Sequence, residues 1–219
     1  MSAVRHSLAH VLAAATRRLY GDDVKFGVGP AIEDGFYYDM DLGERHLSDD
    51  DLAKLEQEMR KILAEKQDFV ASEMTIAEAE KWAKFNSQPY KLELIEDFKN
   101  NGTTKVGAKG KKQSTSAKMS FYTNGDFTDL CMGGHVKNTA DIPADAFKLT
   151  KVAGAYFRGD ETKPMMQRVY GVAFATKAEL DEYLQRQEEA KARDHRKLGR
   201  ELDLYVTSDL VGAGLPMFT

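Results

Sequence analysis

Apolar side chains recur with the period of an α-helix in five stretches of the chain. Residues 4–19 show this spacing most clearly, because each apolar residue lies three or four positions from another. Ser48 followed by Asp51, and Thr176 followed by Glu179, are helix-start signatures. The pattern therefore predicts helices over residues 4–19, 48–66, 75–85, 88–98 and 176–198.

Seven shorter stretches alternate between apolar and polar residues, or are rich in β-branched and aromatic ones, as strands are. Thr123-Asn124-Gly125 lies between two of them, and Asn-Gly is a strong short signal for a hairpin. Strands joined by tight turns pair antiparallel. We predict an α+β protein with antiparallel sheets packed against helices, from strands at residues 24–28, 35–40, 69–73, 119–122, 126–130, 147–158 and 165–174.

One internal stretch, residues 100–118, differs from both patterns. It lacks large apolar side chains almost entirely. Among its glycines, serines and threonines it holds the basic residues Lys105, Lys109, Lys111, Lys112 and Lys118. This composition predicts a loop, with a solvated linker as the first interpretation and contact with RNA as the second.

Composition and charge narrow the class of protein. A chain of 219 residues that is 42% hydrophobic can bury one large or two modest cores. Its formal net charge of −4 excludes a generally basic nucleic-acid binder, so any RNA contact would depend on local clusters. No apolar run approaches the ~18 residues of a membrane span, and no signal peptide follows Met1. The single cysteine fits a reducing compartment, and we expect a cytoplasmic protein without membrane contact.

Four side chains, arranged in two pairs, are candidates for a metal-binding or catalytic site. His6 and His10 are about one helical turn apart, so both imidazoles project from one face of the first predicted helix. Cys131 and His135 have the same spacing but flank two glycines, which favours a turn over a helix interior. A tetrahedral zinc site needs three or four nitrogen and sulfur ligands. If the two pairs meet in the fold, the candidate metal ligands are His6, His10, Cys131 and His135.

Simpler interpretations of these residues stay open. A single histidine is more often a surface or hydrogen-bonded residue than a ligand, and a lone cysteine is usually a small buried hydrophobe. Cys131 with a histidine would also suit nucleophilic catalysis, although nothing marks a helix start at the cysteine. Asp129, two residues before the cysteine, makes the set more typical of a polar catalytic or metal pocket. The sequence contains no P-loop and no Gly-x-Gly-x-x-Gly motif.

Several motifs resemble the editing domain of bacterial threonyl-tRNA synthetases, in the order in which that family carries them. The resemblance runs over nearly the whole chain. After the cysteine this sequence has Met-Gly-Gly-His where the family commonly has Arg-Gly-Pro-His, and the lysine-rich loop looks enlarged, but no polar site residue is lost. The motifs are His6-Ser-Leu-Ala-His10, Gly29-Pro-Ala-Ile-Glu-Asp-Gly-Phe-Tyr-Tyr-Asp39, Gly125-Asp-Phe-Thr-Asp-Leu-Cys131, Ala153-Gly-Ala-Tyr-Phe-Arg-Gly-Asp160 and Arg193-Asp-His-Arg-Lys-Leu-Gly199 with Leu202-Asp-Leu-Tyr205.

The resemblance implies a division of the chain into three parts. An editing domain would occupy residues 1–175, as two α+β lobes at about 1–140 and 141–175, and a connector helix would occupy residues 176–201. Residues 202–219 would begin the class II aminoacylation core of a parent enzyme that binds ATP and zinc in that core and forms a homodimer through it. We expect no aminoacylation from these residues alone.

The resemblance also implies an activity and the residues that carry it. The editing domain of this family hydrolyses the ester of seryl-tRNA(Thr), whose 3′ end enters a pocket and is cleaved by a positioned water. The favoured mechanism requires no metal. The implied residues are, for catalysis, His6, Lys91, Asp129 and Tyr38 and, for substrate binding, His10, Cys131 and His135.

Two rival functions use the same residues. Alanyl-tRNA editing proteins carry the same histidine and cysteine set and hold zinc with it, so a zinc-dependent alanyl-type hydrolase is one alternative. A non-catalytic, zinc-stabilised RNA-binding module is the other. Metal content and deacylation activity would separate the three.

Overall fold

The computed structural model describes residues 1–104, 113, 114, 116–194, 198, 199, 201–207 and 216–218. They fall into two compact units, residues 1–177 and residues 178–219. All the predicted site residues belong to the first unit.

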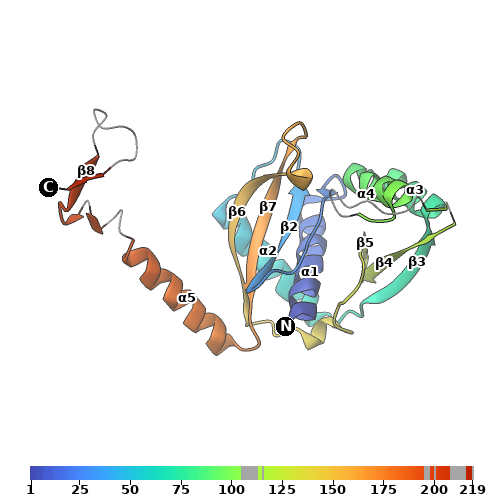
Figure 1. Cartoon of the computed structure of the whole chain (residues 1–219). Coiled ribbons are helices and arrows are strands. Elements are labelled where there is room, and N and C mark those ends of the chain that lie inside the picture. Colours follow the sequence, from blue (N-terminus) through green and yellow to red (C-terminus); the bar gives the residue numbers. More distant parts are fainter. Residues whose placement is uncertain (105–112, 115, 195–197, 200, 208–215, 219) are drawn as a thin grey trace. The chain divides into compact units, whose positions relative to one another are not determined.

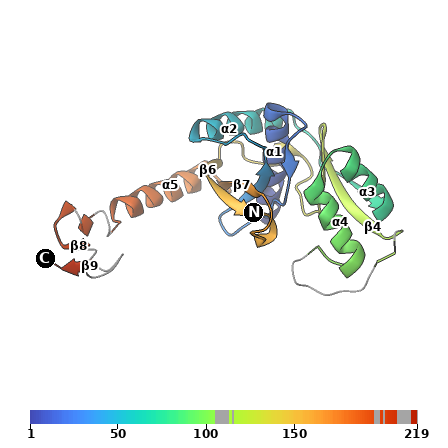
Figure 2. The same cartoon turned by 90° about the horizontal axis from the view of Figure 1, so that it is seen from above.

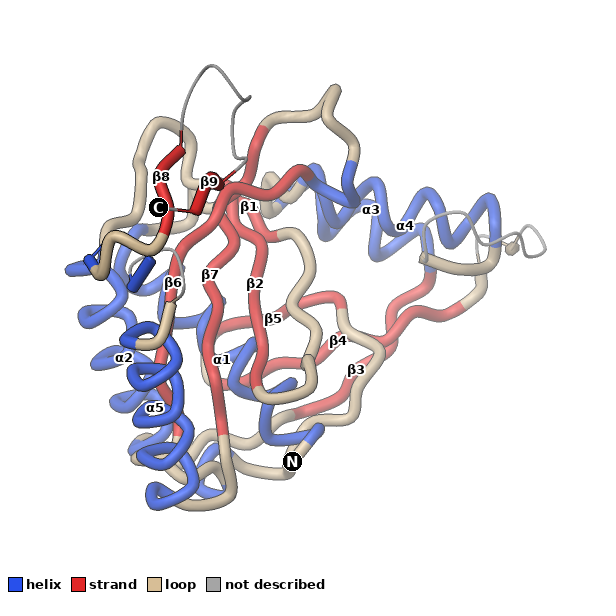
Figure 3. Tube along the Cα trace, turned by 60° about the vertical axis from the view of Figure 1, so that its left-hand side comes forward, coloured by secondary structure: helices blue, strands red, loops and turns tan. Residues whose placement is uncertain are grey.

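The first unit contains a four-stranded antiparallel sheet whose strand order is β1-β2-β7-β6. Two helices, α1 and α2, lie on one face of this sheet (Figures 1 and 3). The sheet contains strands from both sides of position 140, the boundary expected between the two lobes. Its elements are α1 (Ser2–Tyr20), β1 (Lys25–Phe26), β2 (Gly35–Asp41), α2 (Asp49–Ala64), β6 (Phe147–Tyr156) and β7 (Met165–Ala173).

A second antiparallel sheet has the order β3-β4-β5. Helices α3 and α4 pack against each other beside this sheet (Figure 2). Ile76 of α3, Ile95 of α4 and Phe121 of the sheet belong to one buried apolar cluster. Two short 3-10 turns, Thr139–Asp141 and Phe157–Gly159, lie outside the sheets. The elements of this layer are β3 (Val70–Thr75), α3 (Ile76–Phe85), α4 (Pro89–Asn101), β4 (Lys118–Asn124) and β5 (Phe127–Leu130).

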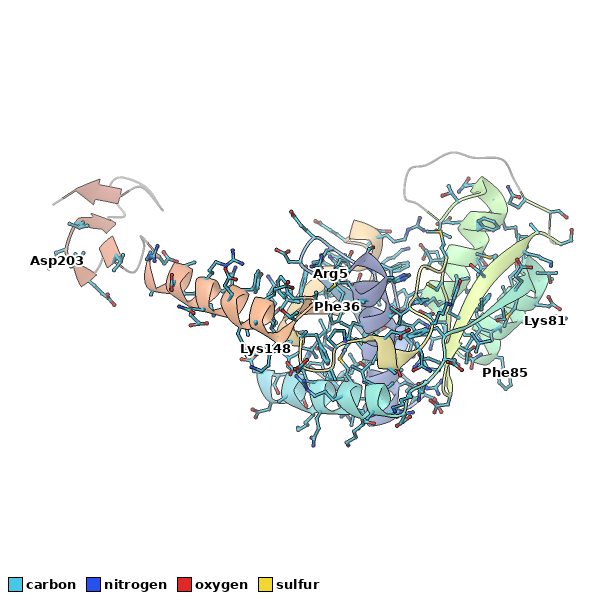
Figure 4. All side chains as sticks on the ribbon, turned by 90° about the horizontal axis from the view of Figure 1, so that it is seen from below. Arg5, Phe36, Lys81, Phe85, Lys148 and Asp203 are labelled. Carbon is cyan, nitrogen blue, oxygen red and sulfur yellow. The ribbon has the colours of Figure 1, made fainter. Side chains whose placement is uncertain are left out.

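The helix-start signature at Ser48 acts as expected, and a second capping box forms at Thr75, where a helix but no capping box was predicted. Ser48 donates its backbone N–H to Asp51 Oδ2 at 2.9 Å, and Thr75 does the same to Glu78 Oε2 at 2.8 Å, so two helices begin at capping boxes. Apolar positions of α1, α2 and the four-stranded sheet form the main core, where Phe36 is fully buried (Figure 4). The α+β prediction with antiparallel sheets and helices is confirmed.

Two expectations differ from the structure in detail, and a third falls mostly outside the described residues. The last predicted helix is α5 (Lys177–Ala192), which ends before residue 198, and residues 195–197 lie outside the described part. The β4–β5 hairpin turns at Gly125 and Asp126, because Asn124 pairs with Phe127 as a strand residue. Most of the lysine-rich loop, residues 105–112 and 115, also lies outside the described residues.

The second unit contains α5 and a short antiparallel pair of strands, β8 (Tyr205–Thr207) and β9 (Pro216–Phe218). Among the helices that the structure describes, none combines the length and the apolar character needed to cross a membrane.

Candidate active site

A cavity of about 600 Å³ lies in the first unit, bordered by α1, α4, the β4–β5 hairpin and the segment that follows β1. Apolar side chains, among them Leu94 and Met119, form much of its wall. Six of the predicted site residues line it, namely His6, His10, Tyr38, Lys91, Asp129 and Cys131, and the other polar side chains in its wall are Thr103, Thr104, Lys118 and Ser120. His135 contacts this set from behind, since its Nε2 is 3.2 Å from Cys131 Sγ.

One group of lining residues, Lys91, Asp129 and Tyr38, is called here the ionic cluster. Lys91 Nζ lies 2.7 Å from Asp129 Oδ1 and donates to the Tyr38 hydroxyl at 3.1 Å. The Tyr38 hydroxyl in turn donates to Asp129 Oδ2. Each of the three residues is at most 4% exposed. Lys91 and Asp129 therefore form a desolvated ion pair, and the Tyr38 hydroxyl is hydrogen-bonded to both of them.

The protonation of Tyr38 follows from its surroundings. Burial raises the pKa of this phenol well above its ordinary value, and the neighbouring charge of Asp129 raises the pKa further. The phenol therefore stays protonated. It keeps the carboxylate of Asp129 and the ammonium of Lys91 in fixed orientations.

Gln88 fixes the start of α4 and hence the position of Lys91, one turn further along. Its amide accepts from the backbone N–H of Phe26 at 2.8 Å and donates to the carbonyl of Val24 at 2.9 Å. Pro89 occupies the first turn of α4, where a missing N–H costs nothing. The edge strand β1 and the helix that carries Lys91 are thus joined by one buried side chain.

The second group, His6, His10, Cys131 and His135, is called the histidine cluster. Cys131 Sγ lies 3.4 Å from His6 Nε2 and 3.2 Å from His135 Nε2. The rings of His6 and His135 are stacked with centroids 4.3 Å apart, and those of His10 and His135 meet edge to face at 5.1 Å. The structure therefore brings together the two pairs that sequence spacing predicted.

The loop after Cys131 places His135 back against α1. Gly133 and Gly134 have φ values of +89° and +88°, which other residues rarely adopt. A Cβ on Gly133 would also lie 2.4 Å from the hydroxyl of Tyr122. The backbone can turn this tightly only because the two residues are glycines.

Burial keeps the histidine cluster uncharged. It lowers the pKa of His10 to about 4 and that of His135 to about 3, and it lowers the pKa of His6 as well. It raises the pKa of the Cys131 thiol. At pH 7 the cluster is a set of neutral imidazoles and a thiol, and the imidazole lone pairs can accept hydrogen bonds or ligate a metal.

Three of the four candidate ligands meet the distance requirement of a shared metal ion. The donor atoms of His6, Cys131 and His135 lie within 4.8 Å of one another, and His10 is not part of this group. Ligand atoms about 2.0 and 2.3 Å from a tetrahedral zinc would be about 3.5 Å apart, close to the two sulfur–nitrogen distances here. Three protein ligands leave one position for water or substrate, as catalytic zinc sites do.

Four polar residues support the site although the sequence analysis did not predict them as site residues. Ser7 Oγ lies 3.2 Å from His135 Nδ1 and accepts from the backbone N–H of Val136 at 3.0 Å. Asn124, expected only as a turn residue, contacts His10. The periodicity of α1 places Ser7 beside the two histidines, but the partners of the others are distant in sequence. The four residues are Ser7, Gln67, Gln88 and Asn124.

Comparison with known proteins supplies the class. Residues 119–170 match the family described as the threonyl and alanyl tRNA synthetase second additional domain. This stretch includes Asp129, Cys131 and His135. This part of the chain is therefore similar to domains of that class.

Curated relatives narrow the class further. The threonine–tRNA ligase of Gloeobacter violaceus is 47% identical over 99% of this chain and 32% of that protein. The threonine–tRNA ligases of Anoxybacillus flavithermus and Thermotoga maritima are 48% and 45% identical, each over 98% of this chain and 30% of theirs. The chain is therefore similar to threonine–tRNA ligases over nearly its whole length, and it spans about a third of the length of these relatives.

Proposed function

We propose that this chain hydrolyses the ester bond of seryl-tRNA(Thr), in which tRNA for threonine carries serine. The observation that carries the proposal is the meeting of the ionic cluster and the histidine cluster in one cavity. The cavity of about 600 Å³ is of the size that small-molecule sites have, and can take a terminal nucleoside with its amino acid. Similarity to threonine–tRNA ligases supports the choice of substrate.

The need for such a reaction follows from the chemistry of the two amino acids. Serine differs from threonine mainly by one missing methyl group, and a missing methylene is worth only about 1–3 kcal/mol of discrimination. An aminoacylation site that accepts threonine therefore also accepts some serine. A second site that admits only the smaller side chain corrects the error.

Ester hydrolysis requires a positioned water, a proton acceptor and a donor for the developing oxyanion. Lys91 supplies N–H donors held in place by Asp129, and His6 supplies an imidazole beside the cavity. In this proposal Lys91 and His6 position and activate waters. Asp129 and Tyr38 orient the substrate, and the remaining members of the histidine cluster shape the pocket for serine.

In the favoured mechanism the reaction needs no metal. The alternative is a zinc-dependent hydrolase of the alanyl-tRNA type, in which His6, Cys131 and His135 would hold the ion and a bound water would supply the nucleophile. A zinc-stabilised RNA-binding module without catalysis is the second alternative. Metal content and activity distinguish them.

The wider context is also part of the proposal. Residues 1–175 would form the editing domain, residues 176–201 the connector and residues 202–219 the start of the class II core. The parent enzyme would attach threonine to tRNA(Thr) with ATP, as a cytoplasmic homodimer. Its name in the relatives, threonine–tRNA ligase, supports this assignment.

The direct test is deacylation of three charged tRNAs by the purified chain. We expect hydrolysis of seryl-tRNA(Thr), with threonyl-tRNA(Thr) spared because its extra methyl group does not fit. Alanyl-tRNA(Ala) tests the alternative hydrolase. Equal rates on seryl- and threonyl-tRNA(Thr), or hydrolysis of the alanyl ester alone, would refute the proposed function.

A further inference from the structure

One nitrogen in the site has no hydrogen-bond partner. His10 is only 2% exposed and lines the cavity, yet its Nε2 is unpaired, alone among the buried side-chain nitrogens and oxygens that the structure describes. A buried polar atom without a hydrogen-bond partner destabilises the folded protein. A ligand that donates a hydrogen bond to this nitrogen would remove that destabilisation.

A chain of hydrogen bonds determines which nitrogen of His10 carries the proton. The carboxylate of Glu65 accepts from Gln67 Nε2 at 2.6 Å, and Gln67 Oε1 accepts from Asn124 Nδ2 at 2.6 Å. Asn124 therefore presents Oδ1 to His10 Nδ1, which lies 2.8 Å away. Because a carboxylate only accepts hydrogen bonds, every hydrogen bond in this series must run towards Glu65. Nδ1 of His10 must therefore carry the proton.

The turn does not explain why Asn124 is there. Gly125 and Asp126 form the turn, with Gly125 at φ +56°, while Asn124 pairs with Phe127 in the ladder. Asn124 is 1% exposed, and its side chain lies between Gln67 and His10. The contact that explains the Asn124 side chain is therefore its hydrogen bond with His10.

We propose that Gln67 and Asn124 are positioning residues that hold His10 with a bare Nε2, and that Nε2 accepts the hydroxyl hydrogen of the serine in the substrate. This inference rests on the proposed function. It adds discrimination between serine and alanine, which the exclusion of a methyl group cannot supply. A pocket that excludes threonine by size admits alanine, which is smaller than serine. An acceptor that is left unpaired by alanine favours the seryl ester, because sites built to bind a hydroxyl reject analogues that lack it.

The first test measures the imidazole directly. Two-bond ¹H–¹⁵N correlation spectra of the chain labelled with ¹⁵N-histidine identify the protonated nitrogen of His10. We expect the Nδ1–H form in the wild type. The variants Gln67→Glu and Gln67→Lys form a matched pair, since the first keeps an acceptor for Asn124 and the second offers only donors.

The two variants should differ in which nitrogen of His10 carries the proton. Gln67→Glu keeps the Nδ1–H form, whereas Gln67→Lys still pairs with Glu65 but turns the Asn124 amide around, so that His10 carries its proton on Nε2. The Nε2–H form in the wild type, or the same form in both variants, would overturn the positioning role.

The second test compares kcat/KM for seryl- and alanyl-esters of the same tRNA. His10→Phe, which keeps a ring but has no acceptor, should lower the seryl-to-alanyl ratio by about 10- to 100-fold. Gln67→Lys should lower the ratio in the same direction, and Gln67→Glu should leave it unchanged. An unchanged ratio in His10→Phe would overturn the role of Nε2. If the wild type cleaves no ester, the proposed function and the serine selection fail together. The spectra would still show in which direction the hydrogen bonds from His10 to Glu65 run.

Discussion

The ionic cluster and the histidine cluster line the same cavity but respond to burial in opposite ways. Lys91 and Asp129 are paired at 2.7 Å, and each is at most 4% exposed. The histidines instead avoid charge, as the pKa of about 4 for His10 shows. Opposite charges compensate each other in the first cluster, whereas the second has no carboxylate in direct contact and becomes neutral.

This difference assigns the clusters different chemical tasks. A desolvated ion pair braced by Tyr38 has fixed donors, which suits the stabilisation of charge that develops on a substrate. Neutral imidazoles and a thiol have free lone pairs, which suit proton acceptance, hydroxyl recognition or a metal. The experiments below disturb one cluster at a time.

The largest effect on stability should come from breaking the ion pair. Lys91→Met leaves the carboxylate of Asp129 buried without its cation, and removal of one partner of a buried pair typically costs about 3–5 kcal/mol. Urea denaturation measures the loss. The double variant Lys91→Met/Asp129→Asn has no uncompensated charge and should recover most of it. A single variant as stable as the wild type would show that the pair is not desolvated.

Acidification should act on the histidine cluster next. The pKa of His10 is about 4 when folded and 6.5 ordinarily, so the unfolded chain binds a proton that the folded chain does not. The contribution of His10 is therefore complete above about pH 6.5 and is lost as the pH falls towards 4, by roughly 3 kcal/mol. Denaturation of the wild type and of His10→Phe across this range isolates the contribution. Parallel curves would refute it.

A smaller effect is expected where α4 meets β1. Gln88→Leu leaves the backbone N–H of Phe26 and the carbonyl of Val24 without their partner, at a cost of about 2 kcal/mol. Phe85→Gln is the control, because this neighbouring side chain is 89% exposed and points away from the body (Figure 4). Thermal unfolding compares the two. Equal midpoints would mean that Gln88 does not hold the helix.

Local sequence signals were sufficient for most of the fold. Helix α1 follows from apolar periodicity, helix α2 follows from periodicity and a capping box, and the β4–β5 hairpin follows from its turn residues. These signals act over a few residues, so they can be read along the chain. The spacing of His6 with His10 is of the same kind.

The rest of the site depends on contacts between distant residues. A lysine in α4 has no local mark that distinguishes it, and Lys91 and Tyr38 were expected only through resemblance to a family. Asn124 illustrates the limit best. Its neighbour Gly125 indicated a turn, whereas its role depends on His10, 114 positions away in the sequence.

The central claim is that fixed side chains, and not a metal, carry out the hydrolysis. It is tested most directly by single-turnover deacylation of seryl-tRNA(Thr) with three samples: the wild type, the wild type stripped of metal by a chelator, and Lys91→Met. We expect the chelated enzyme to keep its rate and Lys91→Met to lose on the order of 10²-fold or more, the usual scale for a positioned acid or base. Loss of turnover on chelation, together with an unimpaired Lys91→Met, would contradict the claim and favour the zinc-dependent alternative.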